Sequence, residues 1–196
     1  MASNNGRFDV VLRLLEAGAL DYQLEWTDTV LELVRGSAIG LERKLKETAC
    51  CELEIKDWWE RTPLLIAIQM GDIQKVELLL KHGANRDAVG RCCKTPMQYA
   101  VENGHVQMLE WLVSREFDIE ATDQFGTTPL VHAVERGHAG CVKYLLDVGA
   151  QIRAKSRDHF PLIYDATSLE VARLLVEHGE CINDISWELH AKLTGT

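Results

Sequence analysis

The stretch TPLVHAVERGHAGCVKYLLDVGA, which runs from Thr128 to Ala150, decides the fold of this chain. Its proline predicts the first turn of a helix, because the fixed φ of proline is already helical and its missing N–H would have no partner there. The threonine before the proline can cap the free N–H groups of that turn. Gly137 indicates a break between two short helices. Gly149 is typical of the residue that ends a helix by taking the left-handed backbone conformation.

The same pattern returns along the chain with a period of 33 residues. Thr-Pro occurs at Thr62-Pro63, Thr95-Pro96 and Thr128-Pro129, and a degraded copy, Phe160-Pro161, follows 32 residues later. Glycine stands twenty residues after Pro63 and Pro129, whereas Glu116 stands at that place after Pro96. A regular period of this length indicates an array of stacked helical repeats.

The second helix of each repeat has apolar residues at i, i+3 and i+4, which predicts a helix buried along one side. Aligned by repeat, these residues form three columns. The first is Val11, Val76, Leu109, Val142 and Ala172; the second is Leu14, Leu79, Leu112, Leu145 and Leu175; the third is Leu15, Leu80, Val113, Leu146 and Val176. We expect each column to fill a layer between neighbouring repeats, so that no repeat is stable alone.

Thr-Pro-Leu at the first helix, Gly-His between the helices and Leu-Leu-x-x-Gly-Ala at the end resemble the ankyrin repeat over nearly the whole chain. The resemblance implies an all-α solenoid of stacked helix–turn–helix units with β-hairpin or loop fingers. The sequence departs from the family pattern at one histidine, which family members use to tie adjacent loops together. The residues at that position are Leu65, Gln98, Val131 and Ile163.

We divide a single domain, residues 1–196, into a partial repeat at 1–26, a divergent repeat at 27–60, repeats at 61–93, 94–126 and 127–158, and a degenerate repeat at 159–190. In the divergent repeat we expect helices at about Thr29–Arg35 and Ile39–Thr48. This alignment puts Arg43 and Lys46, or Lys44 in a shifted register, at core positions. The chain begins and ends inside a repeat, which fits either a short protein with worn terminal repeats or a piece of a longer one.

Composition and charge narrow the possible functions. A formal net charge of −9 argues against general affinity for nucleic acid and favours partners with a basic face. No run approaches the roughly 18 apolar residues of a membrane span, and the start of the chain lacks the pattern of a signal peptide. We expect a monomeric cytoplasmic protein that does not insert into membranes.

The sequence contains no catalytic or phosphate-binding signature, so we predict neither an enzyme nor a cofactor. The adjacent cysteines Cys50-Cys51 and Cys92-Cys93 lack the C-x₂-C spacing that lets two ligands converge on zinc, and we interpret them as thiols rather than metal ligands. Cys92 and Cys93 lie in a predicted finger and would be oxidisable if exposed. Cys141 is expected to be buried.

The resemblance implies that the fingers before each Thr-Pro and the exposed sides of the first helices line a concave binding face. Asp57 holds the hairpin aspartate position of its finger, which leaves Trp58 and Trp59 at the variable tip. Aromatic residues and arginine dominate the energy of protein interfaces. The predicted partner-contacting residues are Trp58, Trp59, Gln69, Met70, Arg91, Glu102, Asn103, Gln124, Phe125, Glu135 and Arg136.

An alternative for the two tryptophans is that one of them packs on the divergent repeat and compensates for its poor core. For the whole chain we predict a non-catalytic module that docks a protein partner on its concave face. The alternative is a regulatory or targeting segment of a larger enzyme, channel or effector protein. Further repeats or a catalytic domain in the full-length gene would favour that alternative.

Overall fold

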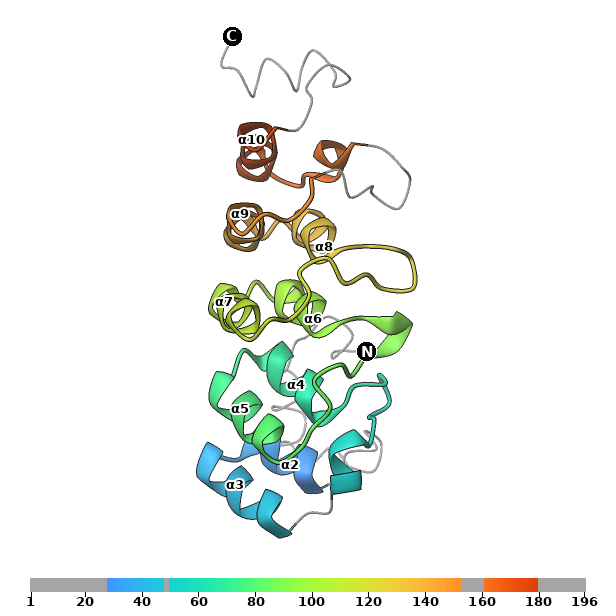
Figure 1. Ribbon diagram of the computed structural model, residues 1–196, viewed down its shortest axis with the longest axis vertical. Helices are drawn as coiled ribbons and strands as arrows, with labels where there is room; N and C mark the ends of the chain where they lie inside the picture. Colours follow the sequence, from blue (N-terminus) through green and yellow to red (C-terminus); the bar gives the residue numbers. More distant parts are fainter. Residues whose placement is uncertain (1–27, 48–49, 153–160, 180–196) are drawn as a thin grey trace, which may run out of the picture. The chain divides into compact units, whose positions relative to one another are not determined.

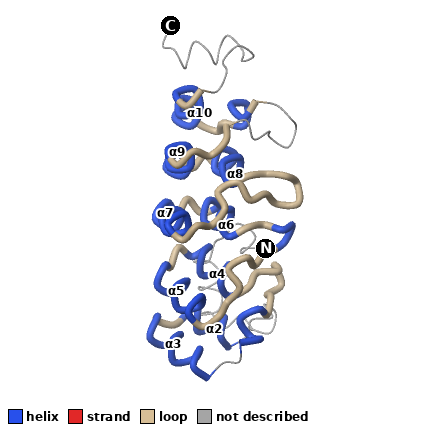
Figure 2. Tube along the Cα trace, in the orientation of Figure 1, coloured by secondary structure: helices blue, strands red, loops and turns tan. Residues whose placement is uncertain are grey.

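The computed structural model describes residues 28–47, 50–152 and 161–179 (Figure 1). Within these ranges all regular structure is helical and no strand occurs (Figure 2). The chain divides into two compact parts, an N-terminal half at residues 1–99 and a C-terminal half at residues 100–196. The predicted partial repeat at 1–26, Phe160 and the end of the degenerate repeat lie outside the described residues.

Among its described residues the N-terminal half contains two pairs of helices, followed by the start of a further pair. α2 (Asp28–Arg35) precedes α3 (Ala38–Glu47), and α4 (Pro63–Met70) precedes α5 (Ile73–Lys81). α2 contacts α4 and α3 contacts α5, so that the first helices form one layer and the second helices another. The connections include the 3₁₀ helices η3 (Cys50–Glu54) and η4 (Arg91–Cys93), and α6 (Pro96–Glu102) spans the division between the halves.

The C-terminal half repeats this two-layer arrangement. Its helices are α7 (Val106–Ser114), α8 (Pro129–Arg136), α9 (Ala139–Asp147), the 3₁₀ helix η5 (Leu162–Asp165) and α10 (Leu169–Glu177). α9 contacts both α7 and α10 in the layer of second helices (Figure 1). α8 contacts η5 in the other layer.

The helix starts have the chemistry predicted from Thr-Pro. Pro63 and Pro129 are the first residues of α4 and α8, and the hydroxyls of Thr62 and Thr128 accept hydrogen bonds from the N–H of the third residue of each helix. A cap of this kind stabilises a helix by about 1 kcal/mol. The degraded copy at Pro161 has no side-chain cap and forms only the short η5. Losing the threonine thus coincides with losing the α-helix.

Two of the three predicted apolar columns form the core between second helices. Their described members are between 0% and 2% exposed, namely Val76, Leu109, Val142 and Ala172, and Leu79, Leu112, Leu145 and Leu175. The third column is mostly half-buried. Of its described members, Leu146 is buried, at 6% exposure, whereas Leu80, Val113 and Val176 keep part of their surface in solvent. Packing in each half therefore depends on the first two columns.

The divergent repeat forms both predicted helices, but the prediction for its core is wrong. Leu41 and Leu45 are 0% and 3% exposed, whereas Arg43 and Lys46 are exposed and Lys44 is half-buried. The two leucines lie four residues apart on α3, so they share the face that the helix turns to the core. The cations consequently stay on the outer side of the helix.

A buried lysine links the first two helix pairs. Lys75 on α5 is 6% exposed, and its Nζ donates a hydrogen bond to the carbonyl of Leu33 at 2.8 Å. The same Nζ lies 3.3 Å from Oδ2 of Asp72. The last carbonyls of a helix lack partners within that helix, so Lys75 satisfies one at the end of α2.

Second helices end in a residue with left-handed backbone, as the glycines predict. Gly83, Gly149 and Gly179 have φ angles of 94°, 94° and 100°. Glu116 takes the same place after α7 with φ 59°, and its N–H donates to the carbonyl of Val113 at 3.0 Å. The helix therefore ends in the same way although its residue at this place carries a Cβ.

Replacing Glu116 with glycine should raise the free energy of unfolding by about 0.5–1 kcal/mol, because it removes the strain of a left-handed residue with a Cβ. The matched control is Glu110→Gly at an exposed position inside α7, which should lower it by about 1 kcal/mol. Urea unfolding measures both variants. A loss of stability in the Glu116 variant equal to that in the control would contradict the account.

Candidate partner-binding fingers

Three fingers precede the Thr-Pro starts, at residues 57–61, 90–94 and 123–127. A backbone hydrogen bond closes the base of each finger, from the N–H of Asp57 to Arg61 at 3.0 Å, of Gly90 to Lys94 at 3.0 Å and of Asp123 to Thr127 at 3.2 Å. The fourth residue of each is left-handed, with φ of 59° at Glu60, 57° at Cys93 and 74° at Gly126. The fingers are therefore tight turns, and no strand extends them in the described residues.

The first finger has a buried ion pair at its base. The carboxylate of Asp57 accepts hydrogen bonds from the backbone N–H of Trp59 at 3.0 Å and of Arg61 at 2.8 Å. Nε and Nη2 of Arg61 donate to Oδ2 of the same carboxylate at 2.9 and 2.6 Å. Both residues are buried, at 5% and 3% exposure, so this ion pair with two charge-assisted hydrogen bonds to one oxygen is formed away from water.

A contact of Arg61 shows that one predicted partner-contacting residue, Gln69, is buried. Its Nη1 donates a hydrogen bond to Oε1 of Gln69 on α4 at 2.8 Å, and Gln69 is only 5% exposed. The prediction that Gln69 lies on the exposed side of its helix is therefore wrong, because its amide helps to hold the arginine. Arg61 was missed in the sequence, where it reads as an ordinary cation before Thr-Pro.

Replacing Arg61 with methionine should lower the free energy of unfolding by about 3–5 kcal/mol, since the Asp57 carboxylate stays buried without its cation. The control is Lys143→Met at an exposed position of α9, where the change should stay within about 0.5 kcal/mol. Urea unfolding followed by circular dichroism compares the two. Equal stability of both variants would show that the ion pair does not hold the finger.

The second finger has glycine where the first has aspartate, and the ring of Tyr99 fills the space. A Cβ at Gly90 would collide with the Tyr99 hydroxyl, so a larger residue is excluded there. Nζ of Lys94 lies 5.4 Å from the centroid of that ring, a cation–π contact. Gln98 stands at the place of the family histidine, and its Oε1 accepts a hydrogen bond from the N–H of Thr95 at 2.8 Å.

The third finger uses a histidine as its anchor. Asp123 accepts hydrogen bonds from the N–H of Phe125 at 2.9 Å and of Thr127 at 3.0 Å, and its Oδ2 lies 3.2 Å from Nε2 of His132. Burial alone raises the pKa of Asp123, but the Thr127, Phe125 and His132 contacts outweigh it and leave this pKa below its usual value. The carboxylate is thus ionised and held in the folded state.

Acidification should weaken the third finger. The pKa of Asp123 is lower in the folded than in the unfolded chain, so its ionised form stabilises the fold at any pH above the usual aspartate pKa. This contribution to the free energy of unfolding is lost as the pH falls below about 4. Asp123→Asn should be less stable than the parent chain at pH 6. Thermal melting at a series of pH values should show this gap closing toward pH 3. A gap that stays constant over this range would contradict the lowered pKa.

The tips of the fingers project into solvent to different extents. Trp58 is 66% exposed, while Trp59 is half-buried with the Arg61 guanidinium carbon 4.9 Å from its ring centroid. Phe125 is 56% exposed in the third finger. Arg91 and Gln124, at the first tip position of the other two fingers, are exposed as well. The two tryptophans therefore differ, because Trp59 is held by its own finger and Trp58 points outward.

A family model described as ankyrin repeats, in three copies, matches residues 1–123 and 116–186. This chain belongs to the ankyrin-repeat family. Ankyrin repeats are generally protein–protein interaction modules, and the family is typically non-catalytic. No curated protein matches the chain.

The first helices of these ankyrin repeats offer a second row of predicted contact residues. Met70, Glu102, Asn103 and Glu135 are half-buried, and Arg136 is exposed. Nη2 of Arg136 lies 2.8 Å from Oε1 of Glu102, so two of the predicted residues form an ion pair between α6 and α8. The amide nitrogen of Asn103 has no hydrogen-bond partner among the described residues.

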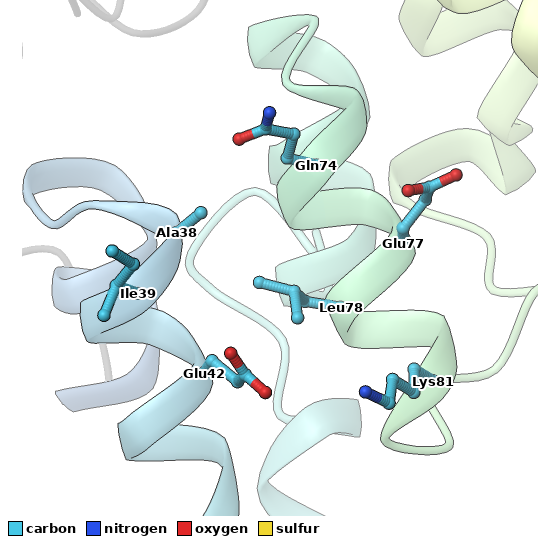
Figure 3. Close-up of a pocket in the computed structure, with 7 residues that line it drawn as sticks. All are labelled: Ala38, Ile39, Glu42, Gln74, Glu77, Leu78 and Lys81. Carbon is cyan, nitrogen blue, oxygen red and sulfur yellow. The ribbon is translucent and has the colours of Figure 1, made fainter.

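The second-helix layer carries a shallow groove between α3 and α5 of about 380 Å³ (Figure 3). Leu78 points across it toward α3, and Ile39 on α3 is 81% exposed. The other lining residues are Ala38, Glu42, Gln74, Glu77 and Lys81. Its polar groups surround an apolar floor and include no serine, cysteine or histidine nucleophile or base.

The cysteines of the described residues differ in their exposure to solvent. Cys141 is 0% exposed, as predicted, and burial raises its pKa to about 11, which keeps this thiol protonated. Cys93 is exposed and Cys92 half-buried in the second finger. The described part of the chain has no group of three or more metal-ligating side chains, and none of its helices is long and apolar enough to cross a membrane.

Proposed function

We propose that this ankyrin-repeat chain is a non-catalytic module that holds a protein partner on its finger tips and on the exposed sides of its first helices. The exposure of Trp58 carries the proposal. A large aromatic side chain is 66% exposed at the tip of a turn whose base is buried and saturated with hydrogen bonds. Covering such a side chain contributes about 1.5–3 kcal/mol to binding.

The rigid base favours binding as much as the exposed tip does. Asp57, Arg61 and Gln69 fix the backbone of the first finger before any partner arrives. A contact residue that is already positioned loses little conformational entropy on binding. Exposed aromatics on fixed turns are also the anchors that dominate the energy of binding surfaces.

The two halves would each contribute contact residues. The N-terminal half supplies Trp58, Trp59, Met70 and Arg91. The C-terminal half supplies Glu102, Asn103, Gln124, Phe125, Glu135 and Arg136. Gln69 is left out of this surface, because its side chain is buried against Arg61. In both halves an exposed aromatic residue stands beside polar side chains, the composition of an interface rather than of a substrate pocket.

The charged groups of the fingers support a role without catalysis. Asp57 and Asp123 are committed to backbone hydrogen bonds at the base of their turns. His132 is buried beside Asp123, at 5% exposure, and its Nδ1 lies 3.9 Å from Oε2 of Glu135. General acid–base catalysis needs such groups within reach of a bound substrate.

Trp58→Ala should weaken binding of a captured partner by roughly tenfold, about 1.4 kcal/mol, without lowering the melting temperature. The partner is identified by pull-down with mass spectrometry, and its dissociation constant is then measured with purified proteins. The control is Trp111→Ala on α7, where the half-buried ring lies 5.1 Å from the Arg115 guanidinium carbon. Unchanged binding by Trp58→Ala, or an equal loss in both variants, would overturn the proposed surface.

A further inference from the structure

We infer that the first two fingers together bind a short acidic segment of the partner, in which an apolar side chain covers Trp58 and carboxylates face Arg91 and its neighbouring lysines. This inference rests on the proposed function and specifies the chemistry of the partner. It follows from the exposed apolar residues of the two fingers and from the charges around them.

The two fingers are joined side by side. Nζ of Lys56 donates a hydrogen bond to the carbonyl of Val89 at 3.0 Å, across 33 residues of sequence. The N–H of Asn85 also donates to Oε1 of Glu54 at 2.8 Å, an exposed hydrogen bond that links the same two connections. Lys56 and Val89 are equivalent residues of successive repeats, 33 positions apart, and the same register makes Arg91 of the second finger the equivalent of Trp58 in the first.

The tip of the first finger and the residues just before the two fingers expose three large apolar side chains, which we call the apolar strip. Trp58 is 66% exposed, Ile55 is 42% exposed and Val89 is 37% exposed. These are three of the eight large apolar residues that stand out on the surface of the described chain, and all three lie on these two connections. A partner residue laid along this strip would remove both ring and aliphatic surface from water.

The charge around the strip is positive although the chain is acidic. The finger at 90–94 carries Arg91 and Lys94 and no carboxylate. Lys56 adds a third cation, while the Asp57–Arg61 pair is buried and neutral as a unit. The exposed acids of the two connections are Glu54, Glu60 and Asp87, of which Glu60 lies on a finger and the other two lie before the fingers.

The affinity of a charged ligand for this strip depends more on the charges next to the strip than on the net charge of −9 of the whole chain. At physiological salt, charges farther than about 8 Å from a contact are largely screened. Arg91 is exposed, and Lys56 and Lys94 are already held against Val89 and Tyr99. Carboxylates placed beside them gain charge-assisted hydrogen bonds, whereas a basic segment would meet three cations. The basic partner that the whole-chain charge favours is thus disfavoured here.

Selection of short random peptides on the intact chain tests this inference. We expect the enriched peptides to carry aspartate or glutamate next to an aromatic or aliphatic residue. Arg91→Glu should weaken a selected peptide by roughly tenfold, and Glu60→Gln should strengthen it by about twofold, because the two changes alter the local charge in opposite directions. Lys94→Gln, which keeps the side-chain stem, should give a smaller loss than Arg91→Glu.

The control is Arg173→Glu at an exposed position of α10, which makes the same change in net charge and should leave peptide affinity unaltered. Enrichment of basic or uncharged peptides would overturn the inference, as would equal losses with Arg91→Glu and Arg173→Glu. These results leave the proposed function standing if Trp58→Ala still weakens the captured partner. If Trp58→Ala has no effect on that partner, the proposed surface itself fails.

Discussion

The structure depends on burial between helices that are too short to be stable alone. The described α-helices have between 7 and 10 residues, whereas isolated helices shorter than about 12–15 residues are marginal in water. Val76 and Leu79 in one repeat, and Val142 and Leu145 in another, are 0% exposed because the neighbouring second helix covers them. Each repeat is therefore held by its neighbours, and its cap and left-handed end residue set its length.

Because the core is built by the helices, the fingers need only fix their own bases. They do so by three different contacts: a buried ion pair between Asp57 and Arg61, a tyrosine side chain against Gly90, and a carboxylate–histidine contact between Asp123 and His132. In each case the buried contacts lie at the base of the turn and leave the first tip residue, Trp58, Arg91 or Gln124, exposed. A fixed base with a variable tip is an arrangement suited to holding a partner without changing the fold.

Local chemistry explains which features could be predicted from the sequence. Thr62, Pro63 and the glycines at 83 and 149 act on their own turn of chain, so their spacing alone predicts where helices begin and end. Arg61, Gln69 and Lys75 act through contacts with residues that the fold brings together, and nothing in their neighbourhood distinguishes them from surface residues. The register of α3 was mispredicted for the same reason, since its two leucines show their role only when α5 is beside them.

The sequence predicts which residues lie on the fingers, but it does not predict which of them are exposed and which are held by other side chains. Trp58 and Trp59 both precede Thr-Pro, which places both on a finger. The contact of the Arg61 guanidinium with the Trp59 ring, which the sequence does not reveal, makes Trp59 the half-buried one and leaves Trp58 exposed. The net charge of −9 favours a partner with a basic face, but it is a sum over the whole chain and does not reveal that the second finger carries two cations, Arg91 and Lys94.

Hydrogen–deuterium exchange of the chain with and without its captured partner tests the central claim, that the finger tips hold the partner, most directly. The account predicts that protection on binding is concentrated in residues 55–61 and 88–95 of the N-terminal half and 123–127 of the C-terminal half. Protection confined to the second helices α5, α7 and α9, with unchanged exchange in the fingers, would contradict it.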